Sequence, residues 1–97
     1  MRFYAAVVGR KKTRGKSQKH YLIASHDPLS VAIRISNERR EKLQVLVIVG
    51  QFESLDDSER FCGRLAAKTG AHKNCFRSLA VDLAVKFGLD VYEMDQM

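Results

Sequence analysis

Hydrophobic and polar residues follow two different spacings along the chain, which divide it into strands and helices. Three stretches rich in β-branched and aromatic residues predict strands, over 3–8, 20–25 and 43–49. The third, LQVLVIV, is apolar without interruption, which is typical of a strand covered on both faces or nearly so. A short edge strand is predicted over 89–93.

Helical spacing predicts three helices between these strands. Asp27 followed by Pro28 indicates a helix start, because an N-cap acid accepts hydrogen bonds from the first turn and proline fits the first helical position. Ser54 and Asp57 form a capping box before the second helix. The apolar spacing predicts that these helices bury Leu29, Ala32, Ile33 and Ile35 or Ser36, then Leu55, Phe61, Cys62 and Leu65, and finally Phe76, Leu79, Ala80, Leu83, Ala84 and Phe87.

The order of these elements, ββαβααβ, predicts an α/β fold. We expect a two-layer α+β sandwich, in which helices cover a small mixed sheet that begins with an antiparallel hairpin. A chain of 97 residues has room for one hydrophobic core, and it contains no stretch that resembles a linker. A single compact domain over 1–97 is therefore expected.

The N-terminus and the cysteines bear on the cellular compartment. The apolar run at the N-terminus is followed, not preceded, by positive charge, and it is far too short to span a membrane. A secreted domain of this size usually carries more than two cysteines. We therefore expect an intracellular protein, cytoplasmic or associated with nucleoid or nucleus, with Cys62 and Cys75 reduced and no membrane partner.

Basic residues are concentrated near the N-terminus. The net charge is +6, and the first 26 residues contain seven basic residues and no acidic one. Such polarised charge commonly contacts phosphates, and a loop needed only for solubility would normally mix signs. Because the most basic stretch is the expected turn of the first hairpin, we predict that nucleic-acid phosphates are bound there by Arg10, Lys11, Lys12, Arg14, Lys16 and Lys19.

Short motifs over roughly residues 3–68 resemble the GIY-YIG endonuclease domain. Phe3-Tyr4-Ala5 and Tyr21-Leu22-Ile23 stand where that family carries its signature tyrosines, and Asp27-Pro28 follows the second strand as it often does in the family. The segment from Val47 to Ser54 is similar to the family's apolar strand and its lead into the next helix. The resemblance implies a nuclease-like fold with a site formed by Tyr4, Tyr21 and Arg34.

The same resemblance implies phosphodiester cleavage with a metal ion held by a helical glutamate. Cys62 stands in the place of that glutamate, and a neutral thiol is a poor ligand for a hard cation. Glu59 lies three residues earlier on the same predicted helix and could replace that glutamate. A glutamate in the first turns of a helix is, however, more often exposed to solvent. We therefore expect nucleic-acid binding without efficient nuclease activity and without a metal site or cofactor, Mg²⁺ being required only if the chain is an active endonuclease.

Two other interpretations stay open. Tyr4, the Gly9-Arg10-Lys11 segment and Phe52 with Ser54 also resemble the hybrid-binding domain at the N-terminus of some ribonucleases H, which binds RNA–DNA duplexes without cutting them. In a different functional class, the basic hairpin contacts an acidic protein partner or packs into a larger assembly, as in a structural or inhibitory protein. The sequence alone does not separate DNA from RNA as the target.

Overall fold

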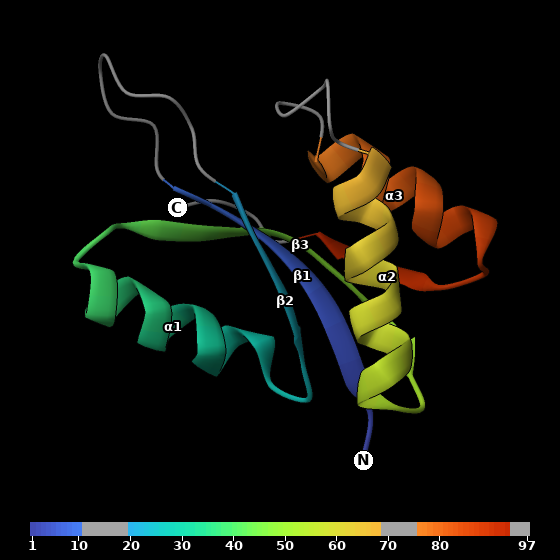
Figure 1. Cartoon of the computed structure of the whole chain (residues 1–97), viewed down its shortest axis with the longest axis horizontal. Coiled ribbons are helices and arrows are strands. Elements are labelled where there is room, and N and C mark those ends of the chain that lie inside the picture. Colours follow the sequence, from blue (N-terminus) through green and yellow to red (C-terminus); the bar gives the residue numbers. More distant parts are fainter. Residues whose placement is uncertain (11–19, 69–75, 94–97) are drawn as a thin grey trace.

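A computed structural model describes residues 1–10, 20–68 and 76–93, which form a sheet packed with helices (Figure 1). The elements are β1 (Phe3–Arg10), β2 (His20–Ser25), α1 (Pro28–Arg39), β3 (Leu43–Phe52), α2 (Leu55–Lys68), α3 (Phe76–Lys86) and β4 (Asp90–Glu93). This confirms the predicted α/β class and the ββαβααβ order. No helix in the described part of the chain is both long and apolar enough to cross a membrane.

The strands are ordered β2-β1-β3-β4, and each pairing between neighbours is antiparallel. The predicted N-terminal hairpin and the addition of the third strand to the same sheet are thereby confirmed. The sheet is not mixed in strand direction, however. Strands β2 and β3 run the same way, but β1 lies between them, so these two parallel strands never pair.

Helices cover both faces of the sheet, which gives three layers where a two-layer sandwich was predicted (Figure 1). Helix α1 packs over Ala6, Val8 and Ile48, whereas α2 and α3 pack over Val7 and Val47 on the opposite face. The physical reason is that β1 is apolar at successive positions, not at alternate ones. Both of its faces must therefore be removed from water.

Helix α1 begins as predicted but buries less than its apolar spacing suggested. Asp27 accepts hydrogen bonds from the backbone N–H and the hydroxyl of Ser30, at 3.2 and 2.6 Å. Ala32 is buried, but Leu29 and Ile33 are 42% and 62% exposed, so their predicted burial is wrong. These two residues are four apart and share one flank of the helix, which borders a groove beside β3.

Helices α2 and α3 form the larger apolar cluster with the sheet. The Ser54 hydroxyl accepts a hydrogen bond from the backbone N–H of Asp57 at 3.1 Å, as predicted for the cap. Buried side chains in these helices include Phe61, Leu65, Ala80, Leu83 and Ala84. Leu55 and Phe87 are 40% and 46% exposed, contrary to prediction. Leu55 is the first residue of α2 and Phe87 follows the last residue of α3, so both lie at helix ends.

Candidate nucleic-acid interface

A network of charged side chains lies at the end of the sheet where the chain leaves β1 and returns in β2. Arg10, the last residue of β1, places its Nη1 atom 3.8 Å from Oε1 of Glu41. The Tyr21 hydroxyl donates a hydrogen bond to Oε2 of the same carboxylate at 2.9 Å. The Arg39 guanidinium carbon lies 5.3 Å from the centroid of the Tyr21 ring, within cation–π range. One glutamate therefore connects β1, β2 and the turn between α1 and β3.

This network favours the neutral form of Tyr21. Its pKa is raised above the ordinary value of a tyrosine, first by the hydrogen bond to Glu41, then by burial and by the negative charge of that carboxylate. The neutral phenol is therefore favoured in the folded protein. At neutral pH Tyr21 is a hydrogen-bond donor that holds Glu41, and not a proton acceptor.

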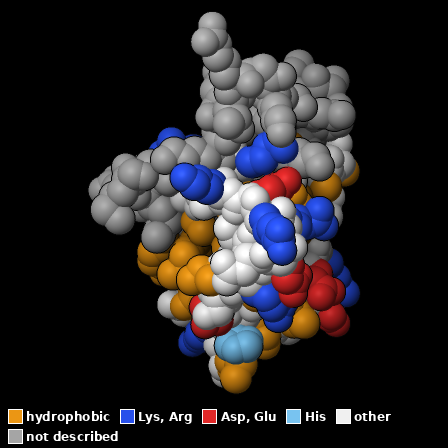
Figure 2. Space-filling model, turned by 90° about the vertical axis from the view of Figure 1, so that its left-hand side faces the viewer, with side chains coloured by type: hydrophobic (Ala, Val, Ile, Leu, Met, Phe, Trp, Pro, Cys, Tyr) orange, Lys and Arg blue, Asp and Glu red, His pale blue; other side chains and the backbone are white. Residues whose placement is uncertain are grey.

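Further basic side chains surround this network. Arg39, Arg40 and Lys42 are exposed, and they occupy the last turn of α1 and the residues leading into β3. Arg40 has a left-handed backbone, with φ of 52°, which turns the chain out of α1. Figure 2 views the molecule from this end and shows Lys and Arg side chains across it, with acidic ones among them and a hydrophobic area beside them. We call Arg10, Arg39, Arg40 and Lys42 the basic end.

One of the six predicted phosphate-binding residues belongs to the basic end. Of that set, Arg10 is described, and its side chain is 17% exposed beside Glu41. The others lie outside the described residues, in the segment 11–19 that joins β1 to β2: Lys11, Lys12, Arg14, Lys16 and Lys19. Both attachment points of that segment, Arg10 and His20, belong to the paired strands. The segment therefore leaves and rejoins the sheet at the basic end.

The structure does not bring Tyr4 and Tyr21 together. Tyr4 pairs with Ser25 and Tyr21 pairs with Val8, so the two tyrosines are four positions apart along adjacent strands, or roughly 13 Å. The Tyr4 ring lies over Gly50 and makes an edge contact with the Tyr92 ring at 6.4 Å between centroids. Tyr4 is therefore packed into the sheet surface, remote from the basic end.

The Arg34 side chain does not lie on the face of α1 that packs against the sheet, so it does not reach either tyrosine from that face. The side chain is exposed, whereas Ala32, two residues earlier, is buried against the sheet. Two residues turn an α-helix by about 200°, so Arg34 points away from the face that covers the strands. The set formed by Tyr4, Tyr21 and Arg34 is thus dispersed over the α1 side of the molecule.

Cys62 and Glu59 lie on the opposite side of the sheet from the two tyrosines. Cys62 is a half-buried free thiol that packs against the α2–α3 cluster, whereas Tyr4 and Tyr21 pack against the α1 cluster. Burial, helped by the charge of Glu59, raises the pKa of Cys62 to about 11, so the thiol is neutral at pH 7. Among the described residues no three His, Cys, Asp or Glu side chains form a group that could hold a metal ion.

Comparison with family models, with curated proteins and with solved structures finds no match to this chain. The site must therefore be interpreted from its own residues. Sequence reasoning missed Glu41 as the residue that organises the basic end, and it did not include Arg39, Arg40 or Lys42. The signal for them was the densely charged segment NERREK, which ends α1 and is followed by the start of β3.

Proposed function

We propose that this protein binds nucleic acid through the basic end together with the segment 11–19, and that it does so without efficient cleavage. The observation that supports the proposal is a convergence in space. Arg10 ends β1, whereas Arg39, Arg40 and Lys42 lie together in the turn from α1 into β3, and the contact of Arg10 with Glu41 joins these two parts of the chain. They meet where the most basic segment of the sequence departs from the sheet.

Phosphate contacts explain why such a surface favours a polyanion. Each phosphate that a Lys or Arg neutralises releases condensed counterions, so affinity increases with the number of contacts and carries little sequence preference. Glu41 is the exception within this surface. It holds Arg10 and Tyr21, so we expect it to position the end of the hairpin and not to contact phosphate.

The binding test is a salt titration with labelled DNA and RNA, each single-stranded and double-stranded. Replacing Lys11, Lys12 and Arg14 together with Ala should weaken binding and lower the slope of log K against log salt by about 0.9 for each duplex phosphate that these side chains neutralise. Fluorescence anisotropy measures both the affinity and this slope between about 50 and 200 mM salt. Over that range such contacts alter affinity by orders of magnitude, ~10³ or more for six contacts.

The matched control removes the same charge elsewhere. Arg2, Lys68 and Lys86 are exposed and lie outside the basic end, so their joint replacement with Ala should leave most of the affinity and the slope in place. Equal losses of affinity in the two triple variants would mean that net charge alone drives binding. Unchanged affinity in the hairpin variant would remove segment 11–19 from the interface.

The absence of efficient cleavage is part of the proposal and is tested separately. It is supported by the neutral thiol of Cys62 and by its placement on the opposite side of the sheet from Tyr4 and Tyr21. Incubation of the natural chain with DNA or RNA and Mg²⁺ or Mn²⁺ should give no brisk cleavage. Metal-dependent cleavage that disappears in Glu59→Gln would instead assign a nuclease site to α2.

A protein partner is the second candidate, and one observation favours it. Leu29 and Ile33 are exposed beside a groove that Leu43 and Val45 also line, so an apolar strip borders α1. Exposed apolar patches often mark protein–protein contact sites. Ile33→Asp should leave nucleic-acid binding intact under the first proposal. Loss of a co-purifying acidic protein in the hairpin triple variant, with no nucleic-acid binding by the natural chain, would favour the second.

A further inference from the structure

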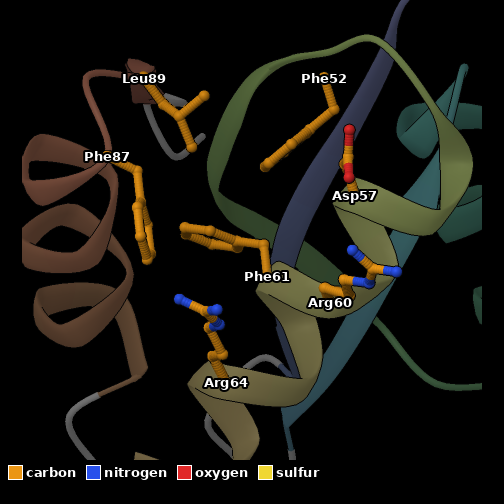
Figure 3. Close-up of a pocket in the computed structure, with 7 residues that line it drawn as sticks. All are labelled: Phe52, Asp57, Arg60, Phe61, Arg64, Phe87 and Leu89. Carbon is orange, nitrogen blue, oxygen red and sulfur yellow. The ribbon is translucent and has the colours of Figure 1, made fainter.

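A pocket of about 240 Å³ lies between α2, α3 and the end of β3, on the face of the sheet opposite α1. Figure 3 shows its lining: side chains from α2 on one side, Phe87 and Leu89 on the other, and Phe52 between them. It shares no residue with the basic end. The lining residues are Phe52, Asp57, Arg60, Phe61, Arg64, Phe87 and Leu89.

Aromatic rings form the walls of the pocket. Phe52 and Phe61 are buried and lie 5.5 Å apart between centroids, with their planes inclined by 56°. Phe87 faces them from the end of α3 and is 46% exposed, although the position after a helix would accept a polar residue equally well. Three aromatic rings therefore line the pocket, and a planar ring system bound there can stack on them or meet them edge to face.

Two arginines supply positive charge at the rim. Arg64 reaches from α2 toward Phe87, and its guanidinium carbon lies 5.1 Å from the centroid of that ring. Arg60, one turn earlier, lies on the Asp57 side of Phe61. Both arginines are exposed, and neither forms an ion pair with a carboxylate in the described part of the chain. Asp57 also lines the pocket, so the lining carries two positive charges and one negative charge. This net positive charge favours an anion, and guanidinium groups suit phosphate oxygens by geometry.

We propose that this pocket binds a single nucleotide, with its base between Phe87 and the Phe52–Phe61 pair and its phosphate on Arg64, and with Arg60 as a second, more distant cation. Stacking of a base on aromatic rings together with a cation on its phosphate is a general way to hold unpaired nucleotides. The choice of a nucleotide among aromatic anions rests on the proposed function. The nucleotide comes either from solution or from an unpaired end of a bound strand.

The test uses the full chain labelled with ¹⁵N and follows backbone amides by NMR. Adenosine monophosphate should shift the amides of Phe61, Arg64 and Phe87, and it should bind at least about tenfold more tightly than adenosine or ribose 5-phosphate, because each of these lacks one half of the contacts. Arg64→Gln and Phe87→Leu should each weaken the mononucleotide about tenfold or more. Lys86→Gln is the matched control, since Lys86 is exposed and does not line the pocket.

The outcomes separate this inference from the proposed function. Equal binding of adenosine and adenosine monophosphate, or unchanged affinity in Arg64→Gln, would overturn it. So would shifts confined to other parts of the molecule. If the natural chain binds long DNA or RNA but no mononucleotide, and a 5′-phosphorylated overhang adds no affinity over a blunt duplex, the pocket inference fails alone. If the mononucleotide binds in the pocket and long nucleic acid does not, the proposed function fails alone.

Discussion

The contact between Tyr4 and Gly50 gives a sharp test of how the sheet is packed. A Cβ atom added at Gly50 would lie 2.8 Å from Cε1 of the Tyr4 ring and closer still to Cδ1. The ring has little room to retreat, because Tyr92 contacts it from β4. Overpacking of this kind typically costs about 1–3 kcal/mol, so Gly50→Ala should destabilise the fold by about that amount. In a domain of this size each kcal/mol lowers Tm by about 4–8 °C.

A double-mutant cycle isolates the steric cause. In a Tyr4→Ala background the new methyl group has space, and Gly50→Ala should then be nearly neutral or stabilising by up to about 1 kcal/mol, because Ala loses less backbone entropy than Gly. The coupling energy is therefore expected to be at least about 1 kcal/mol. Urea unfolding followed by circular dichroism measures all four free energies. Additive effects of the two changes would refute the packing of Tyr4 over Gly50.

Three further predictions concern side chains with different surroundings. Cys62, with its pKa raised to about 11, should react slowly with iodoacetamide at pH 8 and faster as pH approaches 11, judged against Cys62→Ser; fast labelling at pH 8 would contradict its burial. Tyr21→Phe should cost about 0.5–1 kcal/mol at pH 7, because it removes the hydrogen bond to Glu41. Because the folded pKa of Tyr21 is raised, the stability it adds is present below pH ~10 and is lost as pH rises above that value, so the difference from Tyr21→Phe should shrink in alkali. Leu65→Ala should cost about 2–5 kcal/mol by leaving a cavity, whereas Val85→Ala, at a 70% exposed site, should change stability little.

Local signals in the sequence predicted the elements well, because caps and apolar runs act over a few residues. Asp27 with Pro28 and Ser54 with Asp57 mark the helix starts that the structure has. The layering was not predicted, since it depends on which strands become neighbours. The run from Ala5 to Val8 on β1 contains apolar residues for both faces, but so short a run does not tell how many helices will cover it. The burial of Leu29 and Ile33 was also predicted wrongly. The spacing of apolar residues shows which side of a helix is apolar, but not how much of that side the sheet covers.

In the candidate site, too, the sequence predicts some features and not others. The basic segment 11–19 is visible in the sequence because charge needs no partner to be recognised. The role of Glu41 is not, since its partners Arg10 and Tyr21 are 31 and 20 positions away along the chain, and only pairing of β1 with β3 brings them together. The pocket lined by Phe61, Arg64 and Phe87 was likewise hidden, because the sequence assigned both phenylalanines to the core.

The central position of β1 has a consequence for the order in which the fold can be completed. One edge of β1 pairs with β2, which follows it closely, but the other pairs with β3, whose residues come about 40 positions later in the chain. Closing so long a loop is costly in entropy and slows folding relative to the local hairpin. Until residues 43–52 have been synthesised, β1 presents an unpaired edge and a row of apolar side chains. A nascent chain halted before that point is therefore a template for misassociation with its neighbours on a polysome.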